Sequence, residues 1–314
     1  MSKLKLFILF IMVLLISGCT TDATPEPTAT SAPTRDTIVV TDGVGKPITL
    51  PGPARRIISL APANTEILFA LGAGPQIVGR DTTSDYPEQA KTITDIGGGF
   101  GELNLEAILA QNPDLVIASM LTPSEQTKAL QDAGVTVFTL GNPVDFDGLY
   151  TNLHTVAQLT GHEPEAEALV GEMEERVATI QGKMAKNSQR PLVFYEIDGT
   201  DPNAVWTPGP GTFIDSLIQM AGGDNLGANL QGEWVQISLE ELIARDPDLI
   251  LLGDALWGGV TVESVKARAG WEALTAVQKE QIFPFDDNLV SRPGPRLVDG
   301  LEGLARLLHP ELFQ

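Results

Sequence analysis

Residues 104–118 read NLEAILAQNPDLVIA and residues 238–252 read SLEELIARDPDLILL, so a fifteen-residue pattern occurs twice, with six identical positions at an offset of 134. In each copy a short helical segment comes first. Pro113 or Pro247 then prevents the helix from continuing, and an apolar run of strand length follows. The chain therefore contains two matching helix-to-strand units, one in each half.

The residues that begin these helices are also suited to their positions. Asn104 and Ser238 are good N-caps, and Ser238 with Glu241 has the spacing of a capping box. Elsewhere in the chain, apolar runs of strand length also alternate with amphipathic segments. Strands are predicted over 57–60, 135–140 and 192–197, and helices over about 65–71 and 212–221. This order is typical of parallel sheets with helical crossovers, so we expect an α/β fold with two lobes and a ligand cleft between them.

A long segment without internal proline separates the two halves. Residues 164–186 place Leu169, Met173, Val177 and Ile180 on one helical face, which predicts a single helix of about 20 residues and roughly 30 Å. Ahead of the first lobe, two short apolar runs flank a glycine-rich turn, which predicts a β-hairpin. The expected boundaries are the hairpin over 37–55, lobe 1 over about 56–145, linking helices over about 146–188 and lobe 2 over about 189–314.

The N-terminus indicates export. Lys3 and Lys5 precede an unbroken apolar run over 6–16, which is too short to span a bilayer and predicts a signal peptide over 1–18. The run ends in ISGC, which resembles the lipobox of bacterial lipoproteins, so Cys19 is the expected lipidation site and membrane anchor. Residues 19–36 contain no large apolar side chain, so we expect them to be a flexible tether. An ordinary secretory signal is the alternative.

The formal net charge of −21 disfavours polyanionic partners, so no nucleic acid is expected. Solubility in the surrounding medium explains such a charge, and docking on a basic surface is the alternative explanation.

Motifs of catalysis and metal binding are missing from the sequence. It contains no HExxH, Walker phosphate loop or GxSxG, and Cys19 is the only cysteine. The glycines at 97, 98, 99 and 101 do not have the spacing of a dinucleotide loop. His154, His162 and His309 are poorly spaced for one metal. We therefore expect no enzyme, no metal site and no cofactor.

Aromatic residues beside glycine and proline are the candidates for ligand contact. Tyr86, Phe100, Trp206, Trp234 and Trp257 fall in predicted loops, where they would form walls for a large, flat, partly apolar ligand. Core packing is the alternative.

Two arginines in the segment SRPGPR, Arg292 and Arg296, precede the C-terminal helix, where they oppose its dipole. Their expected use is a salt bridge within the fold or a ligand carboxylate, amide or phosphate.

Together, these residues resemble a known family. RIISLAPANTEILFALGA at 56–73, TSDYPEQA at 83–90 and both copies of the repeat are similar to the iron-siderophore and cobalamin binding proteins of ABC importers. Within that family, APANTE followed by SDYP is most similar to the cobalamin-binding members. The resemblance implies two Rossmann-like lobes with parallel sheets, joined by a single long helix, with small closure on ligand binding.

The resemblance also implies site residues. Phe100, Trp206 and Trp234 match aromatic side chains that contact the corrinoid. The full expected ligand-binding set is Phe100, Trp206, Trp234, Tyr86, Thr83, Asp287, Asn288 and Arg292. Thr83 and Ser119 stand where cobalamin-binding members carry aromatics, a departure that bears on the ligand's identity.

Glu106 and Glu240 match the glutamates that engage arginines of the permease, although each is also suited to its helix N-terminus. The implied partners are an ABC permease and ATPase and a small-molecule ligand, with the protein a monomer on the outer face of the cytoplasmic membrane. Cobalamin is the expected ligand. Haem or a ferric siderophore is the alternative, and Tyr86 or Met120 would then supply an axial ligand.

Overall fold

The computed structural model describes residues 37–99 and 101–313. Predictions for the first 36 residues, including Cys19, and for Phe100 lie outside this part of the chain. The described chain begins with the predicted hairpin, in which β1 (Ile38–Thr41) pairs antiparallel with β2 (Pro47–Leu50).

Lobe 1 is built on a four-stranded parallel sheet of order β4-β3-β5-β6. Its strands alternate with helices, as the sequence predicts. The elements are β3 (Ile57–Ser59), α1 (Pro62–Ala70), η1 (Gly74–Gln76), β4 (Ile77–Arg80), η2 (Glu88–Thr92), α2 (Leu105–Ala110), β5 (Leu115–Ser119), α3 (Ser124–Asp132) and β6 (Val137–Leu140).

Lobe 2 repeats this plan. Its parallel sheet has the order β9-β7-β11-β12, so in both lobes the first strand in sequence lies between the second and the third. An antiparallel ribbon of β8 and β10 is added to it. The elements are β7 (Leu192–Glu196), β8 (Ala204–Pro208), α6 (Phe213–Met220), β9 (Asp224–Asn225), η3 (Leu226–Asn229), β10 (Trp234–Ser238), α7 (Leu239–Arg245), β11 (Leu249–Leu252), α8 (Ala255–Gly258), α9 (Val262–Lys266), η4 (Trp271–Ala273), α10 (Thr275–Gln278), β12 (Ile282–Pro284), α11 (Asn288–Ser291) and η5 (Pro310–Leu312).

The sequence repeat falls on equivalent places of the two lobes, α2–β5 and α7–β11. Both helices end before the proline, and the residue preceding it has a positive φ in each copy, 47° at Asn112 and 45° at Asp246. The predicted N-caps are confirmed, since Asn104 accepts from the Ala107 N–H and Ser238 from the Glu241 N–H. The prediction of a capping box is wrong, because the Glu241 carboxylate accepts a hydrogen bond from the Arg245 guanidinium at 2.7 Å and not from the Ser238 N–H.

Two aspartates at equivalent positions of the repeat, Asp114 and Asp248, have the same structural role in their lobes. The Asp114 carboxylate accepts from the backbone N–H groups of Arg55 and Arg56 at 2.8 and 3.0 Å, ahead of β3. At the same place in lobe 2, Asp248 accepts from the Leu192 N–H at 2.7 Å, at the start of β7. Each carboxylate therefore satisfies backbone donors where a central strand begins.

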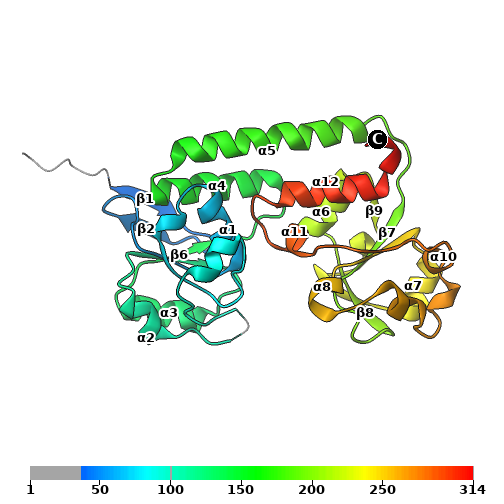
Figure 1. The fold of residues 1–314 in the computed structure, drawn as a ribbon, viewed down its shortest axis with the longest axis horizontal. Helices are drawn as coiled ribbons and strands as arrows, with labels where there is room; N and C mark the ends of the chain where they lie inside the picture. Colours follow the sequence, from blue (N-terminus) through cyan, green and yellow to red (C-terminus); the bar gives the residue numbers. More distant parts are fainter. Residues whose placement is uncertain (1–36, 100, 314) are drawn as a thin grey trace, which may run out of the picture. The chain divides into compact units, whose positions relative to one another are not determined.

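Two helices connect the lobes, α4 (Phe146–Thr160) and α5 (Glu163–Met184), and the second is the predicted long helix. Figure 1 shows α5 beside α4 over lobe 1 and beside the C-terminal helix α12 (Leu297–Leu308) over lobe 2. Arg176 of α5 binds Asp299 and Glu302 of α12 at 2.6 and 3.0 Å. Among the described residues, no helix combines the length and apolarity that a membrane span requires.

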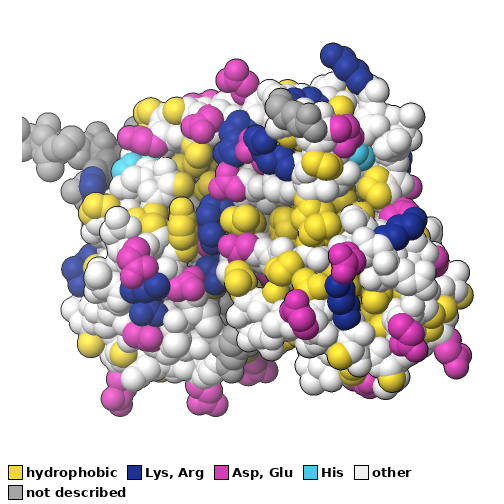
Figure 2. All heavy atoms as spheres, turned by 45° about the vertical axis from the view of Figure 1, so that its right-hand side comes forward, with side chains coloured by type: hydrophobic (Ala, Val, Ile, Leu, Met, Phe, Trp, Pro, Cys, Tyr) yellow, Lys and Arg dark blue, Asp and Glu magenta, His cyan; other side chains and the backbone are white. Residues whose placement is uncertain are grey.

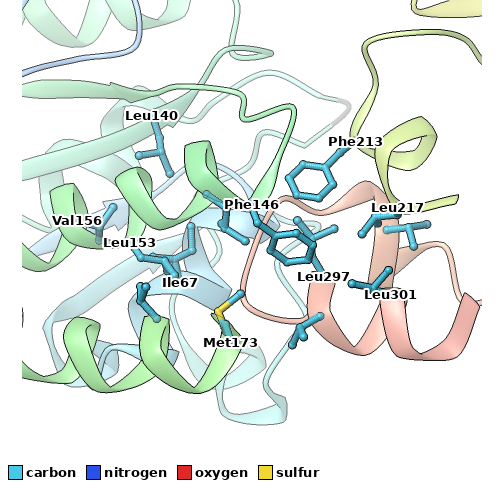
Figure 3. Packing of buried hydrophobic residues seen from close by; sticks show 14 of the residues in the cluster. Ile67, Leu140, Phe146, Leu153, Val156, Met173, Phe213, Leu217, Leu297 and Leu301 are labelled. Carbon is cyan, nitrogen blue, oxygen red and sulfur yellow. The ribbon is translucent and has the colours of Figure 1, made fainter. Parts of the chain in front are cut away.

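The largest core cluster runs through both lobes beneath these helices. In Figure 3, Leu140 and Leu153 lie on one side of this cluster, Leu217 and Leu301 of α6 and α12 lie on the other, and Phe146 lies between them. At the joint, the Phe146 and Phe213 rings meet edge to face with centroids 5.4 Å apart. The lobes therefore share buried apolar surface beneath the connecting helices.

Candidate functional site

The candidate site lies at the carboxyl ends of the parallel strands, where ligands of open α/β sheets bind. Thr83 and Tyr86 follow β4 in lobe 1, while Asp287, Asn288 and Arg292 follow β12 in lobe 2. The fold thus brings residues from distant parts of the sequence to the same end of the two sheets.

Trp206 and Trp234 lie on the β8–β10 ribbon, so the prediction that they occupy loops is wrong. In the register, Trp206 is opposite Gln236 and Trp234 is opposite Pro208, which puts both indoles on one face. That face is solvent-accessible, with 39% of Trp206 and 53% of Trp234 exposed, whereas Val205 and Ile237 on the other face are buried. A two-stranded ribbon with one face in the core leaves the other free for large aromatics.

Further exposed apolar side chains follow other strands of the two sheets. Met120 and Leu121 come after β5 and are 46% and 93% exposed. Leu256 and Trp257 come after β11 and are 65% and 61% exposed. Trp257 was visible in the sequence as an aromatic beside glycines, but the family match did not select it. Met120 was considered in the sequence only as a possible axial ligand of haem, and Leu121 gave no signal beyond its position after a buried strand.

One hollow is lined by residues of both lobes. Lobe 1 contributes the loop after β6, and lobe 2 contributes the start of α6, the beginning of β10 and the end of α11. The lining residues are Asn142, Pro143, Val144, Gly211, Thr212, Phe213, Ile214, Glu233, Trp234, Val290, Ser291 and Pro293. Trp234 is the predicted ligand-binding residue that this hollow contains.

Arg292 takes part in an ion-pair cluster between the lobes. Its guanidinium binds Asp85 at 2.6 Å and Glu66 at 3.3 Å, and Arg296 binds the same Glu66 with two nitrogens at 2.8 and 2.6 Å. Glu66 lies on α1 and is buried. The sequence left open a salt bridge or a ligand contact for these arginines, and the structure shows the salt bridge.

Tyr86 and Asp85 complete this cluster at the surface. The Arg296 guanidinium lies 3.9 Å from the centroid of the Tyr86 ring, which is a cation–π contact. Burial opposes ionisation of Asp85, but the hydrogen bond and charge of Arg292 outweigh it and lower the pKa of Asp85. Tyr86 remains 46% exposed, so part of its ring is free for other contacts.

Asp287 and Asn288 are held by neighbouring groups. The Asp287 carboxylate accepts from the buried Tyr195 hydroxyl at 2.8 Å, and Asn288 donates to Asp286 at 2.9 Å. Burial raises the pKa of Asp287, although hydrogen bonds from Ser291 and Tyr195 oppose the shift. Asp287 is therefore tied to the buried Tyr195 of β7.

Thr83 is positioned by a buried carboxylate. Asp81, which is fully buried, accepts from the Thr83 N–H at 3.0 Å and also from the hydroxyls of Thr83 and Ser84. A Cβ on Gly99 would lie 2.6 Å from Thr83 Cγ2, so the loop of the glycines packs closely on this threonine. Ser119, the other departure from the family's aromatics, ends β5 and its N–H binds Thr122 Oγ1.

Glu106 and Glu240 are exposed in the first turns of α2 and α7, at equivalent places of the two lobes. Neither side chain makes a hydrogen bond or an ion pair with another residue of the described ranges. Both carboxylates are therefore accessible to a partner.

Sequence reasoning missed a buried charged cluster below the ends of β7 and β11. Glu196 is fully buried and binds Arg268 with both oxygens, at 2.6 and 2.7 Å. Asp254 is buried beside them and accepts from the Gly199 N–H at 2.9 Å. Burial, and then the charge of Glu196, raises the pKa of Asp254 to about 7. These residues are far apart in sequence, so no local pattern marks them.

The charges of the site disfavour anionic ligands. The segment that follows β12 carries Arg292 and Arg296, and both are paired with carboxylates. On one face of the molecule, Figure 2 shows most basic side chains beside acidic ones. No group of three or more His, Cys, Asp or Glu that could hold a metal occurs in the part of the chain described.

Comparison with known proteins agrees with this geometry. Residues 57–289 match the family described as periplasmic binding protein. An uncharacterized ABC transporter substrate-binding lipoprotein of Bacillus subtilis, YvrC, is 31% identical over 98% of this chain and 96% of its own. A vitamin B12-binding protein of Yersinia pestis is 32% identical over 80% of this chain and 85% of its own. The haem-binding protein RhuT of Roseiflexus has a TM-score of 0.74 at 30% identity, covering 82% of this chain and 99% of that protein.

The chain therefore belongs to the periplasmic binding protein family, the class of two-lobed solute receptors. More narrowly, it is an ABC-transporter solute-binding protein of the iron-siderophore and cobalamin group.

Proposed function

We propose that the protein binds cobalamin in the cleft between its lobes and delivers it to an ABC permease. The observation that carries this proposal is an exposed tryptophan face together with a neighbouring segment in which Arg292 and Arg296 are already neutralised by carboxylates. A ligand for such a site is broad, partly apolar and not anionic.

Cobalamin has these properties. Its corrin ring is flanked by amides, its cobalt already has a lower ligand, and cyanocobalamin carries no net charge. A receptor can hold it by aromatic contact and by hydrogen bonds to amides without donating a metal ligand. Trp206 and Trp234 supply apolar surface, and Asn142, Ser291 and Glu233 around the hollow supply polar groups. Relatives named for cobalamin and vitamin B12 binding support the same ligand.

Haem or a ferric siderophore is the second candidate, favoured by the structural likeness to RhuT. Exposed Tyr86 and Met120 are side chains that could serve as axial ligands. Haem, however, has two propionates, and the arginines that would bind them are occupied by Glu66 and Asp85.

Calorimetric titration of the purified protein tests the ligand. We expect cyanocobalamin to bind at least tenfold more tightly than haemin, a difference of about 1.4 kcal/mol. Trp234→Ala should weaken cyanocobalamin binding, because it removes half-exposed aromatic surface from the hollow. Val39→Ala, which trims an exposed side chain of the hairpin, is the control and should leave binding unchanged. Binding of haemin or a ferric siderophore without binding of cobalamin would establish the second candidate.

We also propose that Cys19 is acylated and that the protein acts as a monomer outside the cell membrane. The lipobox-like ISGC segment supports this anchor, as does a relative named as a lipoprotein. Metabolic labelling with a fatty acid should label the wild type, and Cys19→Ala should move the protein to the soluble fraction. Absence of label on the wild type would contradict the anchor.

A further inference from the structure

Glu66 is a buried carboxylate, which is rare for glutamate unless it is paired. It lies on α1 of lobe 1, is buried, and has both oxygens in contact with arginines of lobe 2. The two partners, Arg292 and Arg296, are 226 and 230 residues away in sequence. Three ionised groups are therefore gathered at the junction of the lobes, and Asp85 adds a fourth.

This cluster borders the candidate site. Arg292 lies between Ser291 and Pro293, both of which line the hollow. The side chains of Arg292 and Arg296 are still 17% and 16% exposed, and Asp85 is 55% exposed. Both arginines thus keep part of their surface accessible to solvent, and Arg292 directly adjoins residues that line the hollow.

The charges of the cluster balance, with two guanidiniums against two carboxylates. Asp85 can swing into water when a ligand anion competes for Arg292. Glu66 has no such freedom, because leaving its arginines would strand a buried charge. Glu66 is therefore the fixed counter-ion of both arginines.

We propose that Glu66 is a specificity-determining residue, which rejects anionic ligands by neutralising Arg292 and Arg296 from inside the protein. This inference rests on the proposed function only in taking the cleft as the ligand site. A purely structural role, in which the cluster only ties the lobes together, makes a different prediction. Loss of a tie lowers stability or weakens all ligands, whereas loss of a counter-ion improves binding of anions selectively.

Glu66→Gln tests the two roles with a matched pair of ligands, haemin and its dimethyl ester. They share the ring and the iron and differ in two carboxylate charges. We expect the substitution to increase the preference for haemin over the ester by about fivefold or more, and the gain to shrink at high salt. Glu302→Gln, which removes the same charge from a partner of Arg176 at the back of the molecule, is the control and should leave the preference unchanged.

Asp85→Asn provides a second variant, since Asp85 is exposed and its loss strands no buried charge. It should shift the preference in the same direction by a smaller factor, about twofold, because Glu66 still holds Arg292. An unchanged preference for haemin over the ester in both variants overturns the proposal. The ratio does not depend on which ligand the wild type prefers, so failure of the cobalamin proposal would be seen separately, in the titration of cyanocobalamin.

Discussion

At the scale of single residues, the buried carboxyl groups of lobe 2 have the clearest physical consequence. Asp254 is placed beside the fully buried Glu196, whose charge Arg268 balances from the other side. One oxygen of Asp254 binds the Gly199 N–H, and the other has no hydrogen-bond partner among the described residues. A protonated carboxyl suits this environment better than a second charge, which agrees with the raised pKa.

This pKa predicts a pH dependence of stability. The pKa of Asp254 is about 7 in the folded protein, whereas the ordinary value of 3.8 applies to the unfolded chain. Between pH 3.8 and about pH 7 the folded state therefore holds a proton that the unfolded state has lost. Stability contributed by this group is therefore present below about pH 4 and is lost as the pH rises to about 7. Asp254→Asn has no charge to bury, so its Tm should exceed that of the wild type by an amount that grows over this range and then stays level.

Asp246→Asn is a control of opposite sign. Hydrogen bonds from Thr275 lower the pKa of Asp246, so its contribution is present at neutral pH and lost in acid. Its Tm should fall below that of the wild type at neutral pH and approach it in acid. Thermal melts over a series of pH values check both variants, and a pH-independent gap for Asp254→Asn would contradict the assignment.

At the scale of elements, the sequence predicts most of the regular structure where a local pattern determines it. The hairpin, the strands of the repeat and α5 are confirmed, since apolar period and proline position are local properties. β4 was not predicted because it is a short edge strand, Ile77–Arg80, containing a glycine. A Cβ on Gly79 would lie 2.5 Å from Ile58 Cδ1, so packing against β3 requires the residue that weakens the strand pattern.

Site elements were less predictable, because tertiary contacts determine them. Exposed aromatics were found from their neighbours in sequence, but the pairing of β8 with β10 that aligns Trp206 and Trp234 is not a local feature. Arg292 raised the expectation of a salt bridge or a ligand contact, and its partner Glu66 could not be named because the two lie in different lobes. Phe100 lies outside the described residues, so its contact stays a prediction.

At the scale of the whole molecule, the two lobes are coupled on one side. The core cluster continues from lobe 1 to lobe 2, and α5 packs on both α4 and α12. Opening the lobes widely would expose the Phe146–Phe213 contact and break the pairs of Arg176 with α12. Exposing such apolar surface costs about 25 cal/mol per Å², so small changes of the cleft are expected on binding.

Coupled lobes also keep Glu106 and Glu240 at a nearly constant separation, because the segment after each helix is tied to its own sheet by Asp114 or Asp248. Two carboxylates on a stiff body can engage two basic sites of a permease at once, and the second contact then forms at high effective concentration. We therefore propose that uptake requires both carboxylates, one from each lobe.

Replacing both glutamates with arginine tests this docking model. The new charges would face the arginines that the resemblance places on the permease, so we expect uptake by cells to be abolished while the purified protein binds its ligand as before. Glu125→Arg with Glu263→Arg is the matched control, because these exposed acids also lie in the first turns of helices, one in each lobe. The control should leave uptake intact. Normal uptake in the Glu106→Arg and Glu240→Arg double variant would instead show that these carboxylates act only on their helix dipoles. That effect is about 0.3 to 1 kcal/mol for each carboxylate and would be measured as a loss of stability.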